Sequence, residues 1–111
     1  MKTEESKVNN VVILKLFDKI DASSSKDLLM LVKGMIEENK LKLLLDMQDV
    51  ESVDSSGLGV LISCLKNISN AGGHLKIAQL HNGTKNTFYL TRLDRIFEIY
   101  DNNATAVESF R

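Results

Sequence analysis

Apolar positions along the first third of the chain follow first a strand-like and then a helix-like period. Thr3 to Val8 and Val11 to Phe17 are predicted strands, joined at Asn9-Asn10 because asparagine tolerates the positive φ of a tight hairpin turn. A helical pattern then runs to about Asn39, and Asp21 is its predicted N-cap. The apolar face of this helix consists of Leu28, Leu31, Val32, Met35 and Ile36.

The middle of the chain predicts a strand, a helix and a second strand. Leu41 to Asp46 is almost continuously apolar, as expected for a central strand covered on both faces. After a polar connection, a second helix is predicted to begin near Ser56 or Gly57 and to end at Gly72-Gly73. His74 to Leu80 alternates polar and apolar residues, which predicts a half-buried strand. The apolar face predicted for the helix consists of Leu58, Leu61, Ile62, Leu65 and Ile68.

The last third predicts smaller elements. A turn at Asn82-Gly83 precedes a helix from Thr84 to Arg92, followed by an edge strand from Ile96 to Tyr100 and a terminal helix from Ala104 to Phe110. Strands that alternate with helices predict an α/β fold, here with four to five strands in a mixed sheet and about four helices. The inward residues predicted for the Thr84 to Arg92 helix are Phe88 and Leu90.

Composition narrows the class of protein. The 111 residues carry a formal net charge of −1 and only 5% aromatic residues, so nucleic-acid binding is not expected. The single cysteine, Cys64, excludes an internal disulfide, and no apolar run reaches the roughly eighteen residues of a membrane span. Without a signal peptide or linker signal, residues 1–111 are expected to form one cytoplasmic domain.

The stretch Asp54-Ser55-Ser56-Gly57-Leu58-Gly59 joins the central strand to the second helix. Aspartate and serine are common helix caps, so these residue types by themselves favour capping without a further role. A serine at a helix N-terminus is also a suitable phosphorylation site, because the helix dipole and free amides stabilise the added charge. The residue types alone leave both interpretations open.

Signatures of enzymes and cofactor sites are missing from the same stretch. No Gly-x-Ser-x-Gly elbow surrounds the serines, and Ile62 stands where a dinucleotide fingerprint needs its third glycine. His74 and His81 have no plausible partners for metal binding or base catalysis. We therefore expect no enzyme activity, no cofactor and no metal.

Five segments resemble the anti-sigma-factor antagonists of the bacterial STAS-domain family in both order and spacing. The most specific is Val53-Asp54-Ser55-Ser56-Gly57-Leu58-Gly59-Val60-Leu61. The other four are Lys19-Ile20-Asp21, Leu43-Leu44-Leu45-Asp46, Gly72-Gly73-x-Leu75 and Leu90-Thr91-x-Leu93-Asp94-x-Ile96-Phe97.

The resemblance implies a STAS-like regulator whose unphosphorylated form binds an anti-sigma factor. That partner is also a serine kinase of the histidine-kinase-like ATPase type, and its capture frees a sigma factor. Kinase action on the serine after the aspartate, reversed by a serine phosphatase, would switch binding off. By position the target is Ser55, with Ser56 as the alternative. The implied partner-binding residues are Asp21, Asp54, Ser55, Ser56, Gly57, Leu58 and Gly59.

The resemblance also implies particular roles in this stretch. Asp54 would orient or tune the acceptor hydroxyl, and Gly57 and Gly59 would hold the helix start close to the sheet. Two residues depart from the family pattern. Asp18 stands where glycine is usual, which predicts a differently shaped turn, and Ser52 stands where an aromatic residue is common.

A second function remains open beside the switch. The chain could be a constitutive STAS-like adaptor subunit of a lipid-transport or stress-signalling complex. In that role the Asp-Ser-Ser-Gly stretch would serve only as a helix cap and contact surface.

Overall fold

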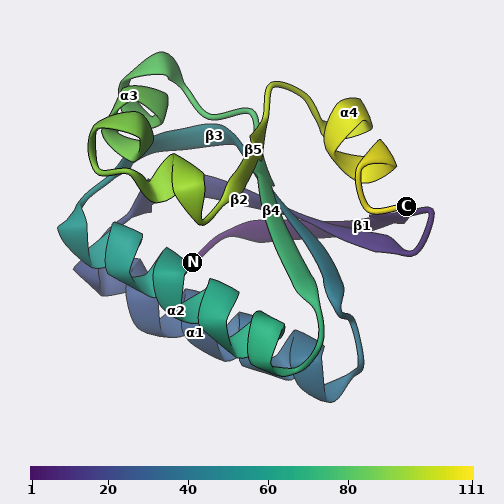
Figure 1. Ribbon diagram of the computed structural model, residues 1–111. Helices are drawn as coiled ribbons and strands as arrows, with labels where there is room; N and C mark the ends of the chain where they lie inside the picture. The colour runs from purple at the N-terminus through teal and green to yellow at the C-terminus, as the bar shows by residue number, and fades with distance from the viewer.

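The computed structural model describes residues 1–111 as a five-stranded mixed sheet with four α-helices and one short 3₁₀ helix (Figure 1). The strands lie in sequence order, with β1 and β2 antiparallel and all later neighbours parallel. This arrangement confirms the predicted α/β fold with a mixed sheet. The strands are β1 (Thr3–Val8), β2 (Val11–Ile20), β3 (Lys42–Val53), β4 (His74–Ala78) and β5 (Glu98–Tyr100). The helices are α1 (Ala22–Glu37), α2 (Ser55–Asn70), α3 (Asn82–Leu90), η1 (Leu93–Arg95) and α4 (Asn103–Glu108).

The N-terminal hairpin has the predicted turn. Asn9 and Asn10 have φ angles of 51° and 66°, and Val8 pairs with Val11. Two successive residues with positive φ match the right-handed twist of the flanking strands. The asparagines therefore provide the turn that joins β1 to β2.

The central strands are longer than the sequence predicts. β2 continues to Ile20, and β3 continues through the supposed polar connection to Val53. Register shifts near Phe17 and Asp18 keep the two strands paired up to the Ile20–Val53 pair. The charged residues of this segment made it look like a loop, yet parallel pairing of β2 with β3 satisfies its backbone.

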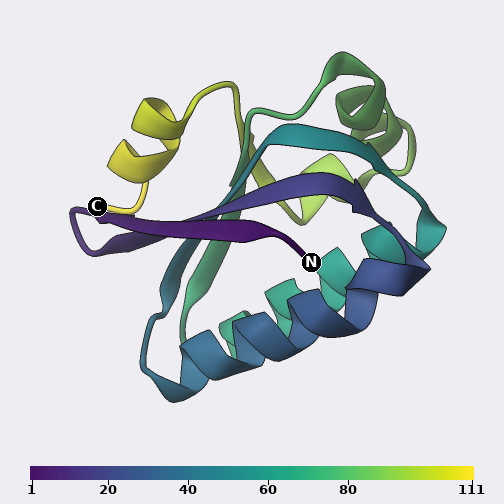
Figure 2. The same ribbon diagram turned by 180° about the vertical axis from the view of Figure 1, so that it is seen from behind.

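The helices α1 and α2 lie side by side on one face of the sheet (Figures 1 and 2). From α1 the buried residues Leu28, Val32 and Met35 enter the core, as predicted. The buried side of α2 is rotated from the prediction, because Val60 and Cys64 are buried while three predicted residues are only half-buried. Those three residues are Leu58, Ile62 and Leu65.

The opposite face of the sheet is partly covered by α4. Ala106 and Val107 of α4 pack with Val11, Ile13 and Leu44 in a second, smaller core. Four of the five residues of β4 are buried, with Leu75 and Ile77 in the main core and Ala78 in the smaller core with α4, so the prediction of a half-buried strand is wrong. The buried residues of β4 include Lys76, whose Nζ donates hydrogen bonds to the main-chain oxygen and Oγ of Ser109.

The segment from α3 to β5 is anchored by an aromatic pair. The buried rings of Phe88 and Phe97 meet edge to face with centroids 5.7 Å apart. Phe88 is therefore an inward residue as predicted, whereas Leu90 is 84% exposed. Residues two apart on a helix point in nearly opposite directions, so the two could not both face the core. No helix of the structure is long and apolar enough to cross a membrane.

Candidate functional site: the paired starts of α1 and α2

Two neighbouring parallel strands end together and place two helix starts beside one another. Ile20 is the last residue of β2 and pairs with Val53, the last residue of β3. The next residues, Asp21 and Asp54, are the N-caps of α1 and α2. The Asp54 amide donates to the Ile20 carbonyl at 3.2 Å, which connects the two strand ends. The structure therefore brings Asp21 and the Asp54–Gly59 stretch to one end of the sheet.

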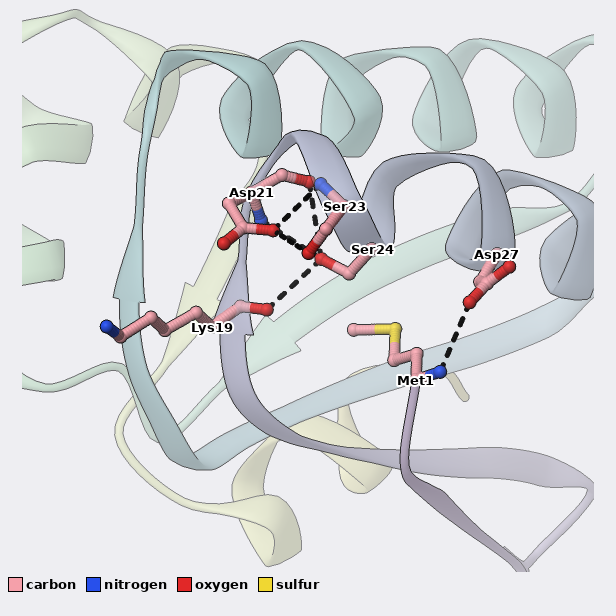
Figure 3. A network of polar contacts seen from close by, with 6 residues as sticks. All are labelled: Met1, Lys19, Asp21, Ser23, Ser24 and Asp27. Carbon is pink, nitrogen blue, oxygen red and sulfur yellow. Dashed lines mark hydrogen bonds and ion pairs between the residues drawn. The ribbon is translucent and has the colours of Figure 1, made fainter.

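The cap of α1 is a closed network of short polar contacts (Figure 3). Asp21 Oδ1 accepts from the amide of Ser23 at 2.9 Å and from its hydroxyl at 2.6 Å. The Asp21 amide donates to Ser24 Oγ, and the Ser24 hydroxyl donates to the Lys19 carbonyl at 3.1 Å. This reciprocal capping box fixes the direction in which α1 leaves the sheet.

The charge on Asp21 is favoured by these contacts. The hydrogen bond from the Ser23 hydroxyl lowers the pKa of Asp21, and the Ser23 and Ser24 amides and the nearby Lys19 act in the same direction. Asp21 is thus a carboxylate held in one orientation at neutral pH, with its Oδ1 accepting two hydrogen bonds from Ser23.

The start of α2 is held by the side chain of Asp54. Asp54 is the N-cap, and its Oδ1 accepts from the Gly57 amide at 2.8 Å. The helix therefore begins at Ser55, one residue before Ser56, which agrees with the prediction that it begins near Ser56 or Gly57. Asp54 forms no hydrogen bond with the Ser55 hydroxyl, and its carboxylate is instead used to hold the first turn.

Both serine hydroxyls at the start of α2 are available to a partner. Ser55 and Ser56 are exposed, and neither hydroxyl makes a hydrogen bond within the chain. Asp54 is the N-cap of α2, so neither serine hydroxyl is needed to cap the helix. Ser56 is attached to the neighbouring helix through its carbonyl, which lies 3.5 Å from Ser25 Oγ. Ser55 has no such side contact.

The two glycines of the stretch have different environments. A Cβ at Gly57 would lie 2.1 Å from the Ile20 carbonyl oxygen and 2.8 Å from Val53 Cγ1, so only glycine fits there. A Cβ at Gly59 would meet nothing within 4 Å, and this residue is exposed. Of the two glycines, only Gly57 therefore allows the start of α2 to pack closely against the end of β2. Leu58, between the two, is half-buried against the main core.

The two departures from the family pattern lie at the rim of this surface. Asp18 has a φ of 64°, the left-handed conformation that favours glycine. It lies inside β2 at a register shift, three residues before the Asp21 cap of α1. Ser52 is exposed and pairs with Lys19 across the strands.

A polar hollow of about 370 Å³ adjoins the α1 cap. Asp21, Asp18 and Glu51 line it, with Phe17 as one of its two hydrophobic residues. Met1 also lines it, and the N-terminal ammonium of Met1 pairs with Asp27 of α1 at 3.1 Å (Figure 3). Such walls suit contacts with polar groups of a protein surface more than an apolar small molecule.

Groups that could perform covalent chemistry lie away from the serines or are inert. Burial raises the pKa of Cys64 to about 12, so its thiol is protonated at neutral pH. The ring of His81 contacts the Gln48 carbonyl at 2.6 Å and is not adjacent to Ser55. The arrangement can present a hydroxyl and two carboxylates to a partner.

Sequence reasoning identified most of these residues but missed one. The Ile20 carbonyl accepts from Asp54 and excludes a Cβ at Gly57, and nothing in an isoleucine side chain signals such a backbone role. The only signal was indirect, since a glycine directly after two serines suggests a close backbone approach.

Curated relatives of the chain are found among bacterial regulators. A Thermotoga maritima protein described as a candidate anti-sigma factor antagonist is 41% identical over 70 residues, which are 63% of this chain and 62% of that protein. The match thus spans about three fifths of that relative. The anti-sigma F factor antagonist of Paenibacillus polymyxa is 26% identical over 98 residues, covering 87% of this chain and 84% of the relative.

Solved structures agree with this fold over almost the whole chain. The crystal structure of the Thermotoga maritima protein matches with a TM-score of 0.90 and 31% identity, covering 96% of this chain and 92% of that one. The phosphorylated form of Bacillus SpoIIAA has the same fold, with a TM-score of 0.75, 14% identity, and coverage of 99% and 100%. The family model of the STAS domain matches residues 3–106, and the chain therefore belongs to the STAS domain family.

Proposed function

We propose that this chain is an anti-sigma factor antagonist switched by phosphorylation of Ser55. In its unphosphorylated form it binds an anti-sigma factor that is also a serine kinase of the histidine-kinase-like ATPase type, and thereby frees a sigma factor. A serine phosphatase restores the binding form. The function is supported by the names of the relatives, and the observation that carries the switch is the exposed, unbonded hydroxyl of Ser55 at the first position of α2.

The surroundings of Ser55 explain how a phosphate would act. The added group carries about −1.5 to −2 charges at neutral pH. The phosphate would lie beside Asp54, whose carboxylate already accepts the hydrogen bond of the Gly57 amide. This amide is therefore not free to donate a hydrogen bond to the phosphate. The fixed carboxylate of Asp21 lies at the same end of the sheet. A partner that contacts this surface would therefore meet added bulk and added negative charge.

The remaining residues have distinct parts in the proposed docking surface. Asp21, Asp54, Ser55, Ser56 and Gly59 would touch the partner from the exposed starts of the two helices. Gly57 and Leu58 would shape this surface from below, since Gly57 is buried against β2 and Leu58 is half-buried in the core. Ser56 remains the alternative phosphorylation site, because its hydroxyl is as free of hydrogen bonds as that of Ser55.

Binding measurements on charge variants test this function. Ser55→Asp should weaken binding to the cognate anti-sigma factor by at least about tenfold, whereas Ser55→Asn, of similar size without charge, should retain most of it. Isothermal titration calorimetry with both variants separates charge from bulk. Undiminished binding by Ser55→Asp would contradict exclusion by charge.

The constitutive adaptor is the second candidate function, favoured by the fact that Asp54 acts as an ordinary helix cap. In that role the chain would remain bound to a lipid-transport or stress-signalling complex whatever the state of Ser55. A pull-down from native lysate, with and without phosphatase treatment, distinguishes the two functions. A histidine-kinase-like ATPase captured more strongly after phosphatase treatment supports the switch, and a transporter ATPase captured equally in both samples supports the adaptor.

A further inference from the structure

The short helix α4 lies on the sheet face opposite α1 and α2 and is held there by little apolar surface (Figures 1 and 2). Its two buried side chains, Ala106 and Val107, are small, whereas α1 and α2 bury several larger ones. A six-residue helix is unstable by itself, so α4 depends on its contacts with the sheet. The free energy that keeps α4 in place is therefore small for an element of the core.

Polar groups at both ends of α4 fasten it to buried charged residues of the sheet. At the start of the helix, Asn103 Nδ2 donates to Asp46 Oδ2 of β3 at 2.9 Å. Beyond its end, the Ser109 carbonyl and Oγ accept from Lys76 Nζ of β4 at 3.0 and 2.9 Å. Asp46 and Lys76 are both buried. These two ties act on opposite ends of one helix.

Both buried charges have further partners that do not belong to α4. Asp46 Oδ1 accepts from Gln79 Nε2 at 2.8 Å and from the Gln48 amide at 3.0 Å. The Lys76 ammonium lies 3.6 Å from Glu98 Oε1 of β5. Removing a helix is costly when it leaves an uncompensated charge in a dry interior. Because Asp46 and Lys76 would keep these partners, the sheet can release α4 without that cost.

The contact between α4 and the sheet is also imperfect. Asn103 Oδ1 is buried without a hydrogen-bond donor, and such an atom favours a state in which water reaches it. A hollow of about 300 Å³ separates part of α4 from the β1–β2 hairpin, with Val8 and Ile13 on the hairpin side and Ala104 and Val107 on the helix side. The closed position of α4 therefore leaves both a polar atom and some apolar surface unmatched.

A hinge for α4 is present at Asn102. The preceding residue, Asp101, is held by Lys85 of α3, whose Nζ donates to Asp101 Oδ1 at 2.8 Å. Asn102 is exposed and extended, and its side chain accepts from the Thr105 amide within the helix itself. A rotation at Asn102 would therefore move α4 together with its own cap while α3 and β5 stay in place.

We propose that α4 is a hinged strap that opens from the sheet as a unit while the five strands and the helices α1 to α3 remain folded. The ties at Asp46 and Lys76 hold the strap closed, and the partners that both groups retain make the open form accessible. Opening exposes a second surface on the face away from the starts of α1 and α2. This hidden surface is an apolar strip formed by Val11, Ile13, Leu44 and Ala78.

Thiol labelling of the full chain measures the opening. Val107→Cys places a thiol on the buried side of α4, and the native Cys64 in the main core reports global unfolding of the same molecule. Ellman's reagent should label the introduced thiol at least about 100-fold faster than Cys64, because a strap opens without global unfolding. Equal rates for the two thiols would show that α4 leaves only when the whole protein unfolds, which would overturn the proposal.

Two neighbouring asparagines provide a matched pair for the tie at Asp46. Added to Val107→Cys, Asn103→Asp places a second carboxylate beside Asp46, so labelling of the introduced thiol should accelerate by at least about tenfold. Asn102→Asp makes the same chemical change at the exposed N-cap, where aspartate serves as well as asparagine, and should leave the rate unchanged. Equal acceleration by both variants would contradict the tie.

Hydrogen exchange followed by NMR separates opening as a unit from fraying of the last turn. Ser109→Ala removes the hydroxyl that binds Lys76, and should accelerate exchange of the Ala106 and Phe110 amides by the same factor, at least about threefold. Acceleration of Phe110 alone, or of neither amide, would contradict the strap. Circular dichroism first establishes that each variant folds. If Asn103→Asp does not fold, the labelling ratio in Val107→Cys and the exchange pattern in Ser109→Ala decide the proposal.

Discussion

The carbonyl oxygen of Ile20 occupies the space in which any residue other than glycine at position 57 would place its Cβ. The two would lie 2.1 Å apart, and the Ile20 carbonyl also accepts the Asp54 amide at 3.2 Å. One backbone oxygen at the end of β2 thus determines both how α2 starts and how closely it approaches the sheet. The orientation of the Ser55 hydroxyl depends on this contact, because Ser55 lies between Asp54 and Gly57.

Gly57→Ala and Gly59→Ala are expected to change stability in opposite directions. Alanine at 57 must displace the backbone of β2 or α2, so the free energy of unfolding should fall by about 1–3 kcal/mol. Alanine at 59 meets nothing within 4 Å and replaces glycine inside a helix, which should raise it by about 0.5–1 kcal/mol. Urea denaturation of both variants measures the difference, and equal effects would refute the close contact at Gly57.

Gly59→Ala also reports on the proposed docking surface. Its added methyl group points to solvent, so a loss of binding to the anti-sigma factor in this more stable variant would identify a direct contact. Unchanged binding would place the partner away from this turn of α2.

The titration of Asp21 should reveal its capping box. The Ser23 hydroxyl bond lowers the folded-state pKa of Asp21 below its ordinary value of 3.8. The stabilisation from this group is therefore present above the unfolded-state pKa and is lost as the pH falls through the folded-state pKa. NMR titration of the carboxyl group should give a midpoint below 3.8 that moves upward in Ser23→Ala. A midpoint unaffected by Ser23→Ala would contradict the assigned cause.

Cys64 should be unreactive in the folded protein. Burial raises its pKa from 9.0 to about 12, and the thiolate is the reactive form. Ellman's reagent at pH 8 should react slowly without denaturant and rapidly in urea. Because the folded-state pKa is the higher one, the stabilisation associated with this thiol is present below pH 9.0 and decreases as the pH rises toward 12. Fast labelling of the folded protein would show that the site opens readily.

The order and type of the elements could be predicted from periodicity, because long apolar patterns leave few alternatives. The ends of the strands were harder to predict than their order. The charged residues Asp49 and Glu51 suggested a loop after Asp46, yet β3 continues to Val53. Asp46 itself is buried in β3 and accepts hydrogen bonds from Gln79 and Asn103. Those donors come from distant parts of the chain, and no local pattern signals them. The burial of Lys76 could not be predicted for the same reason, because the residues that cover its side chain belong to the C-terminal segment around α4.

The candidate site was predictable in its residues but less so in their roles. Aspartate and serine at a strand–helix junction are recognisable as caps, and Asp21 and Asp54 are indeed N-caps. Which residue begins α2 depends on the backbone contact with Ile20, which sequence alone does not reveal. The helix begins at Ser55 with Asp54 as its cap, and the hydroxyls of Ser55 and Ser56 are both free of hydrogen bonds within the chain.

Phosphorylation of the purified chain by its cognate kinase tests the proposed switch most directly. The wild-type protein, Ser55→Ala and Ser56→Ala are each incubated with kinase and ATP, and the intact mass is measured by mass spectrometry. We expect the wild-type protein and Ser56→Ala to gain one phosphate group, and Ser55→Ala to gain none. A phosphate that is still added to Ser55→Ala, or that is lost in Ser56→Ala alone, would contradict the assignment of the switch to Ser55.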